Sequence, residues 1–140
     1  MLSQHLSSMT VPTRGRGFTE ITRDLQARVR DSGVAQGLCT VLLRHTSASL
    51  VIQENADPDV RADFERFFAR LVPDGDRLFE HTAEGADDMP AHIRAALTAV
   101  TLGIPIVDGR LALGTWQGVY VWEHRQDPHR RTLAVHVVGE

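Results

Sequence analysis

The sequence predicts an α+β protein, in which helices and strands are segregated along the chain. Three segments with helical spacing of apolar residues lie in the first two thirds of the 140 residues, and short β-branched runs close the chain. A doubly wound parallel sheet would need helices and strands to alternate throughout. We find no linker and no internal repeat, and therefore expect a single domain over residues 1–140.

Three helices are expected, over residues 18–33, 57–73 and 90–100. In each helix, apolar side chains recur three or four positions apart, which produces a stripe facing the core. The second helix begins with Asp57 and Pro58, residues typical of the N-cap and of the first helical position. Its core stripe is expected to consist of Val60, Phe64, Phe67, Phe68 and Leu71.

Extended structure is expected first over residues 37–55, because this run is apolar and β-branched and lacks helical spacing. Short strands should follow near 104–107 and 111–113. A final strand pair, 115–124 and 131–140, should be joined by the turn between them. A further short strand around Leu78 to His81 is also conceivable, and His5 should lie in a frayed terminus.

Composition narrows the chemistry that the chain can perform. All 15 lysine or arginine positions are arginine, which excludes a lysine Schiff base and a P-loop lysine. The single cysteine, Cys39, excludes an internal disulfide and a cysteine-rich zinc site. Cys39 lies on the apolar face of a strand, with Val41, Leu43 and His45, and should be buried and inert.

Charge and hydropathy bear on partners and location. The net charge of −3 gives no indication of nucleic-acid binding. No apolar run approaches the ~20 residues that a membrane span needs, and residues 1–10 lack the pattern of a signal peptide. We therefore expect a cytoplasmic protein without nucleic-acid or membrane partners.

Residues 84–93, EGADDMPAHI, combine acidic residues, a proline and a histidine where the third helix should begin. Asp88 or Met89 at the N-cap and Pro90 in the first turn would explain part of this pattern. Capping does not explain His92, because a protonated imidazole is unfavourable beside the positive end of a helix. A neutral imidazole there is suited to metal binding.

A metal site is therefore the alternative to simple capping. His45, His81 and His92 could converge and hold zinc or a similar ion, with a fourth position open for water or substrate. The carboxylates that could orient the histidine N–H groups belong to Glu84, Asp87 and Asp88.

Residues 44–49, RHTSAS, place His45 where a strand runs into a polar turn. The hydroxyls of Thr46, Ser47 and Ser49 could bind phosphate oxygens, or they could satisfy their own backbone in the turn. A serine beside His45 also makes Ser/His/Asp hydrolysis conceivable, although the chain has no GxSxG elbow.

Two further stretches could contact a ligand. Glu54 and Asn55 could orient a substrate or coordinate a cation, or belong to a solvated loop before the second helix. In LGTWQG, residues 113–118, the glycines suggest a close backbone approach or a bulge. Gln117 and the indole N–H of Trp116 could contact a ligand there, or Trp116 could fill the core.

A basic turn follows in EHRQDPHRR, residues 123–131. Arg125, Arg130 and Arg131 are grouped in a way that suits bidentate binding of phosphate or carboxylate, and the alternative is a solvated charged turn. His136, in the last strand, is expected to be a core or interface residue.

Four stretches together resemble the YjbQ-type proteins, secondary thiamine-phosphate synthases, from about Phe18 to the C-terminus. They are RHTSASLVIQENADPDV, HTAEGADDMPAHI, GRLALGTWQGVYVWEHR and the closing VVGE. The resemblance implies a mixed, strongly bent β-sheet with about three helices packed on it, assembled as a homotrimer. It also implies a weak thiamine-phosphate synthase activity, which joins hydroxymethylpyrimidine diphosphate to thiazole phosphate and releases pyrophosphate.

The residue chemistry and the resemblance together define an expected site for a small phosphorylated substrate and a divalent metal, zinc or magnesium. Because lysine is absent, arginine and the metal must neutralise the diphosphate. The expected catalytic residues are His45, Glu54 and Asp88, and the expected metal ligands are His45, His81 and His92. The expected substrate contacts are Thr46, Ser47, Ser49, Asp87, Thr115, Trp116, Gln117, Arg125 and Arg131.

Two other functions use the same residues. Histidine-bound zinc could activate water to hydrolyse a small phosphorylated or acyl substrate. Alternatively, the protein could be a non-catalytic trimer that binds a metal or ligand. His124 belongs to a less uniform part of the motif, and neither it nor His136 is assigned a role.

Overall fold

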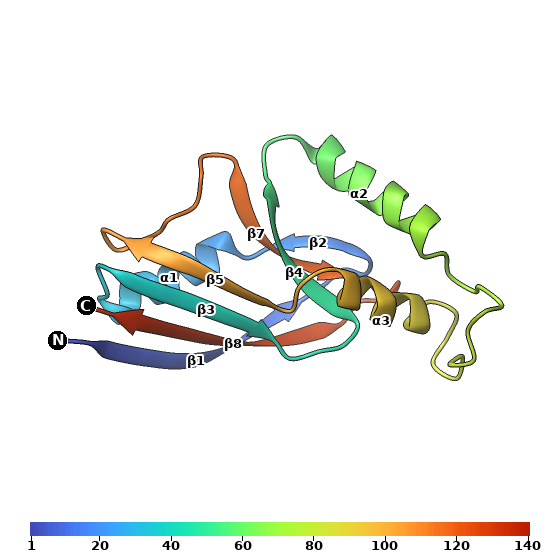
Figure 1. Cartoon of the computed structure of the whole chain (residues 1–140), viewed down its shortest axis with the longest axis horizontal. Coiled ribbons are helices and arrows are strands. Elements are labelled where there is room, and N and C mark those ends of the chain that lie inside the picture. Colours follow the sequence, from blue (N-terminus) through green and yellow to red (C-terminus); the bar gives the residue numbers. More distant parts are fainter.

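The computed structural model describes residues 1–140 as two antiparallel sheets and three helices (Figure 1), which confirms the α+β fold class. One sheet has five strands in the order β1 (Ser3–Pro12), β8 (Arg130–Gly139), β3 (Gly37–Leu43), β5 (Thr101–Val107), β6 (Arg110–Leu111). The other has three, in the order β2 (Gly17–Glu20), β7 (Gln117–Glu123), β4 (Ala48–Glu54). The helices are α1 (Thr22–Ser32), α2 (Pro58–Leu71) and α3 (Asp88–Leu97). Every strand pairing is antiparallel, where a mixed sheet was expected.

The core lies between the two sheets and α1. Alternate residues of β8, Leu133, Val135 and Val137, point inward because strand side chains alternate between the two faces. Leu25 and Val29 of α1 are completely buried against this face. Each such side chain contributes about 1.5–3 kcal/mol by leaving water. Figure 1 shows α1 lying behind β3 and β5.

Cys39 belongs to the same core, as expected. Its side chain is completely buried in β3, between the inward-facing residues of the five-stranded sheet. Burial raises the pKa of the Cys39 thiol to about 11. Since the thiolate is the reactive form, this cysteine is chemically inert in the folded protein.

The N-terminal residues form β1, so the expected frayed terminus is wrong. β1 pairs with β8 along its whole length, from Ser3 opposite Gly139 to Pro12 opposite Arg130. The strand carries few inward apolar side chains, only Met9 and Val11 being buried, which is why its hydrophobic pattern is faint.

The expected single run over 37–55 forms two strands that belong to different sheets. The two C-terminal strands, which were expected to pair with each other, also belong to different sheets. β3 and β8 belong to the five-stranded sheet, whereas β4 and β7 belong to the three-stranded sheet. The chain crosses between the sheets at 44–47 and again at 124–129. The first crossing meets the start of β8, directly after the second crossing, because Arg44 N–H donates to the Thr132 carbonyl at 3.0 Å. This meeting point positions the candidate site.

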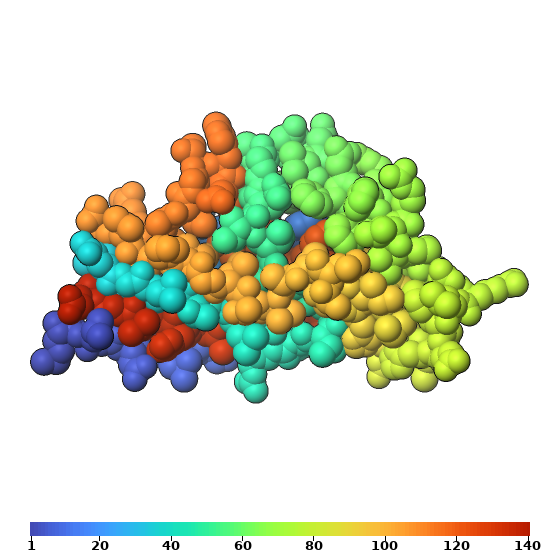
Figure 2. All heavy atoms as spheres, viewed as in Figure 1, coloured from blue at the N-terminus to red at the C-terminus, as the bar shows by residue number.

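The second helix has the expected bounds but a different role. α2 contains no fully buried residue, and Phe67 is 51% exposed, so its apolar stripe is not a core stripe. Phe64 and Phe68 instead pack against Trp122, with ring centroids 6.0 and 4.8 Å away. Figures 1 and 2 show α2 at the outer edge of the molecule. Its apolar side chains repeat as in a core helix although only one edge of the helix meets the sheet.

The other helices begin at different residues from those expected. α1 starts at Thr22, since residues 17–20 pair with β7 as strand β2. α3 starts at Asp88, with Asp87 in the N-cap position and no side-chain capping hydrogen bond. The segment before it, 72–87, contains no strand at 78–81. None of the three helices is both long enough and apolar enough to cross a membrane.

Candidate metal centre

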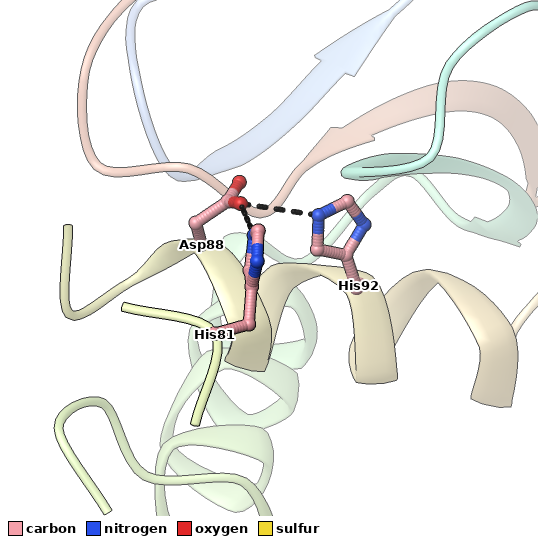
Figure 3. Close-up of side chains that lie close together, drawn as sticks. All are labelled: His81, Asp88 and His92. Atoms are coloured by element: carbon pink, nitrogen blue, oxygen red, sulfur yellow. Dashed lines mark hydrogen bonds and ion pairs between the residues drawn. The ribbon is translucent and has the colours of Figure 1, made fainter. Parts of the chain in front are cut away.

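Two histidines and one aspartate converge at the start of α3 (Figure 3). Nε2 of His81 lies 2.7 Å from Asp88 Oδ2, and Nε2 of His92 lies 3.1 Å from the same oxygen. The three candidate ligand atoms all lie within 4.8 Å of one another. Figure 3 shows both imidazole rings directed at the carboxylate, His92 from the helix and His81 from the preceding loop. The expected convergence of His81 and His92 therefore exists within one chain.

The orientation of His92 is fixed from its other ring nitrogen. Nδ1 lies 2.9 Å from the backbone oxygen of Thr46, which can only accept, so Nδ1 carries a proton. In the neutral ring, Nε2 then carries the lone pair, and a metal ion bound between Nε2 and Asp88 Oδ2 would use it. Metal-binding histidines commonly donate their other N–H to a backbone carbonyl in this way. Thr46 thus contributes its backbone, whereas its hydroxyl was the expected contact.

Asp88 is buried, being only 2% exposed, and is surrounded by donors. Its Oδ1 forms an ion pair with Arg125 Nη1 at 2.9 Å, which leaves Oδ2 for the two histidines. Burial by itself raises the pKa of Asp88, but the hydrogen bond from His81 and the charge of Arg125 outweigh it and lower this pKa. Asp88 is therefore an ionised carboxylate, the form that binds a metal.

The local sequence explains why these groups meet. Asp88 and His92 are four residues apart in α3, so they lie on one face of the helix. Arg125 holds the loop before the helix, since its Nη2 donates to the Glu84 carbonyl and its Nε to Asp87 Oδ2, both at 2.9 Å. Gly85 turns this loop with a φ of 111°, a conformation that other residues rarely adopt. Asp87 and Arg125 thus support the cluster from behind.

The donor set fits a zinc-type ion. The ligands of a tetrahedral zinc lie about 3.3 Å apart when the metal–ligand bonds are about 2.0–2.1 Å long. The two histidine nitrogens lie 2.7 and 3.1 Å from Asp88 Oδ2, close to this spacing, and all three candidate ligand atoms lie within 4.8 Å of one another. Two imidazoles favour zinc or a neighbouring transition metal, whereas magnesium prefers oxygen ligands. The side chains of His81 and His92 are partly open to solvent, being 47% and 30% exposed.

His45 is not part of this cluster, and the expected three-histidine set is replaced by two histidines and Asp88. Nε2 of His45 accepts the Thr132 N–H at 2.8 Å, so its proton is on Nδ1. Nδ1 then faces Arg131 Nη1 at 3.4 Å, a donor facing a donor, which is not a hydrogen bond. Burial and the charge of Arg131 lower the pKa of His45 and keep it neutral.

A second polar group is buried beneath the crossing strands. Arg131 Nε donates to Glu123 Oε1 at 2.8 Å, and Arg131 Nη2 pairs with Glu123 Oε2 and donates to Ser47 Oγ. Thr13 Oγ1 also donates to Glu123 Oε1, at 2.7 Å. Arg131 is 3% exposed and Glu123 is completely buried. Arg131 and Ser47, expected to contact substrate, are therefore engaged in a structural ion-pair network.

Ser49 and His124 form another buried pair. Ser49 Oγ lies 2.9 Å from His124 Nε2, and both side chains are completely buried. Burial, together with the charges of Arg94, Arg16 and Arg131, lowers the pKa of His124 to about 3. Ser49 was expected to bind substrate, but no solvent-exposed surface reaches it.

The remaining expected residues lie at the opposite end of the three-stranded sheet. Glu54, the last residue of β4, pairs with Gln117, the first of β7. Glu54 Oε2 accepts the N–H groups of Ala56 and Asp57 and so shapes the start of α2. Because β4 is seven residues long, this end lies about 20 Å from the end near Thr46. Glu54 is therefore not a partner of the histidine cluster.

The LGTWQG stretch is exposed rather than part of the core. Thr115 and Trp116 lie in the turn before β7, and Trp116 is 63% exposed. Gln117 Oε1 accepts the Gly114 N–H at 2.7 Å and closes this turn. A Cβ on Gly118 would lie 2.8 Å from Glu20 Oε2, which confirms the expected close approach there.

Two functional features could not be assigned from the sequence. Asp88 was expected to orient the histidine N–H groups, but its place in the candidate ligand set instead of His45 was not expected, although the Asp-x-x-x-His spacing on one helix face was a usable signal. The burial of Glu123 opposite Arg131 had no local signal, because it depends on the crossing of two sheets.

The fold and the cluster define an α+β protein with a two-histidine, one-aspartate centre beside a sheet crossing. The chain belongs to the UPF0047 protein YjbQ-like family, whose model matches residues 7–140. It is 58% identical to UPF0047 protein sll1880 of Synechocystis sp. over 137 residues, 98% of this chain and 93% of that protein. It is 43% identical to UPF0047 protein YjbQ of Escherichia coli O157:H7 over 134 residues, 95% and 96% of the two chains.

Solved structures agree with this family and fold. A YjbQ/UPF0047 protein of Clostridium acetobutylicum matches with a TM-score of 0.85 at 36% identity, covering 94% of this chain and 98% of that one. A YbjQ-like protein of Sulfolobus solfataricus matches with a TM-score of 0.89 over the full length of both chains. At 21% identity the latter likeness concerns the fold alone.

Proposed function

We propose that this protein is a metal-dependent enzyme acting on a small phosphorylated substrate, with His81, Asp88 and His92 holding a divalent ion of the zinc type. The observation that carries the proposal is the convergence of two ring nitrogens on one oxygen of a buried carboxylate. Capping does not account for this contact, because Asp87 and not Asp88 occupies the N-cap position of α3.

A pocket beside the cluster supports a small substrate. It has a volume of about 320 Å³, within the usual range for small-molecule sites. His81 lines it together with Arg77, Phe79 and Met89. Arg77 is exposed and forms no ion pair with the chain, so its guanidinium is free for a phosphate group.

The reaction we propose is the transfer implied by the family resemblance, thiamine-phosphate synthesis from a pyrimidine diphosphate and a thiazole phosphate. A bound divalent ion would neutralise negative charge on the departing diphosphate, because a diphosphate leaving group needs cations to stabilise it. Within the chain, Asp88 and the histidines position the ion, Arg125 holds Asp88 ionised, and Arg77 binds phosphate oxygens.

Purified, zinc-loaded protein should form thiamine phosphate and release pyrophosphate from hydroxymethylpyrimidine diphosphate and thiazole phosphate. His92→Ala should abolish the activity, because it removes a ligand. His5→Ala, which changes an exposed histidine of β1, is the matched control and should retain it. Equal activity in both variants would refute the metal site, and no activity with any added metal would refute this reaction.

A second candidate is metal-dependent hydrolysis of one small phosphate or acyl ester. The openness of the cluster favours it, since His81 and His92 remain accessible to water and the adjacent pocket is small for two substrates at once. Release of phosphate or alcohol from a panel of esters, lost on His92→Ala but not on His5→Ala, would select hydrolysis. Metal binding without turnover in either assay would indicate a non-catalytic metal-binding protein.

We also propose the homotrimer that the resemblance implies. The outer face of the five-stranded sheet exposes Leu6, Leu38 and Leu42, which are 77%, 40% and 44% exposed. These leucines share one face, since the strands pair Leu38 with Val138 and Leu42 with Ala134 of β8. Light scattering should give a mass three times that of the chain. Leu42→Glu should reduce this mass, and Leu78→Glu, in an exposed loop, should not.

A further inference from the structure

A groove lies away from the metal cluster, between α1 and the β5–β6 hairpin. Its volume is about 570 Å³. It is lined by Thr22, Arg23, Gln26, Arg30, Asp108, Gly109, Arg110, Leu111, Leu113 and Gln117. Gln117 pairs with Glu54 at the far end of β4 from Thr46, so about 20 Å of strand separates this groove from the cluster.

Three arginines make the groove positively charged. Arg23 and Arg30 lie seven residues apart on α1 and therefore on the same face of the helix, and Arg110 faces them from the hairpin. The only carboxylate in the lining is that of Asp108. The net charge of the lining is therefore +2, although the net charge of the whole chain is −3. Arg23 and Arg110 form no ion pair within the chain, and Arg30 has only an exposed contact with Asp31, at 3.6 Å.

The walls of the groove are held in place by Gln26. Its Nε2 donates to the Gly109 carbonyl at 3.1 Å, and its Oε1 accepts the Leu111 N–H at 3.0 Å. The turn itself needs φ values of 51° at Asp108 and 76° at Gly109. The half-buried amide of Gln26 thus fixes the distance between the helix that carries two arginines and the hairpin that carries the third, so the groove is preformed.

We propose that this groove binds a small organic phosphate, with the phosphate on the three guanidinium groups and the apolar part of the molecule against Leu111 and Leu113. Unpaired arginines suit planar, bidentate contact with phosphate oxygens. The volume suits a small ligand rather than a macromolecule. This second site gives a role to the exposed LGTWQG stretch, whose Gln117 lines the groove, and does not depend on the proposed function.

The test uses two probes of similar charge, inorganic phosphate and phenyl phosphate, added to ¹⁵N-labelled protein freed of metal by a chelator. Phenyl phosphate should shift the amide resonances of Gln26, Gly109 and Leu111 saturably, and inorganic phosphate should bind the same residues more weakly. Arg23→Gln and Arg110→Gln should each weaken phenyl phosphate binding roughly tenfold, the usual effect of losing a charged hydrogen bond. Arg70→Gln, an equal charge change in exposed α2, should leave it unchanged.

Other outcomes would overturn the proposal. Shifts confined to the histidine cluster, or equal weakening in Arg70→Gln and Arg110→Gln, would show that the groove is not the site. Binding of a single-stranded oligonucleotide without binding of phenyl phosphate would replace the small ligand by a nucleic acid. His92→Ala protein should still bind phenyl phosphate, so failure of the metal site and failure of this groove can be distinguished.

Discussion

His92 Nδ1 is hydrogen-bonded to the backbone oxygen of Thr46, a residue 46 positions earlier in the chain, at 2.9 Å. This contact joins the first turn of α3 to the crossing between β3 and β4. It determines which nitrogen of His92 carries the proton and which one faces Asp88. The ring is thereby prepared for a metal by the backbone of another element, independently of the side chain of Thr46.

Loss of either helical ligand should remove the metal affinity. We expect His92→Ala and Asp88→Asn to weaken zinc binding by more than about 100-fold. Losing a residue that only supports a metal ligand typically costs up to about 100-fold, and losing a ligand itself should cost more. Competition with a chromophoric chelator measures this affinity, and His5→Ala serves as the control. Affinities that are equal in all four proteins would place the metal elsewhere.

Arg125 should act on the metal through Asp88 without touching it. Arg125→Gln removes the 2.9 Å contact with Asp88 Oδ1 and the contacts with Asp87 and the Glu84 carbonyl. Because partners of a metal ligand typically contribute 10–100-fold to affinity, we expect a loss of roughly that size. The same chelator competition reports it. Arg130→Gln, an exposed neighbour in the same basic segment, should show no loss.

The buried pair of Arg131 and Glu123 should dominate local stability. Arg131→Met leaves the Glu123 carboxylate buried without its charged partner, which typically costs about 3–5 kcal/mol. The exposed neighbour change Arg130→Met should cost less than about 0.5 kcal/mol. Urea unfolding gives both free energies. A similar small cost in both variants would mean that Glu123 is solvated or neutral in the native state.

His124 should make stability rise with pH on the acid side of neutrality. Its folded pKa of about 3 lies below the unfolded value near 6.5, so between these values the unfolded chain binds one more proton. Stability should therefore fall as the pH falls through this window, by up to about 1.4 kcal/mol per pH unit. His124→Gln should reduce this slope in urea unfolding measured from pH 4.5 to 7. Parallel slopes would show that His124 is charged in the folded protein.

The sequence predicts elements well where one pattern determines one element. Helical spacing located α2 almost to the residue, because Asp57 and Pro58 mark its start: Asp57 accepts the Asp59 N–H at 2.9 Å. The same spacing could not show that Phe67 stays exposed, because burial depends on what the helix packs against. β1 was missed for a similar reason, since its backbone pairing with β8 stabilises a strand with few inward apolar residues.

The candidate site was predictable in part. His81 and His92 could be recognised because imidazoles beside a helix start are poorly explained by capping. His45 was assigned to the same site because it was expected at a strand end, where the strand runs into a polar turn. In the structure the chain leaves one sheet at Leu43 and enters the other at Ala48, and His45 is held by the Thr132 N–H on the way. Where two sheets cross cannot be determined from the spacing within either segment.

The pairing of β1 with β8 also constrains how the chain is made. β8 lies between β1 and β3 in the five-stranded sheet. Since β8 is synthesised after both of these strands, neither can form its pairing with β8 until β8 has left the ribosome. Such long-range pairing slows folding, and until then the inner faces of β1 and β3 stay exposed. Both ends of the chain emerge on the same side of the molecule (Figure 1). A circular permutant that places β8 directly before β1 should let this hairpin form first and so refold faster than the natural order.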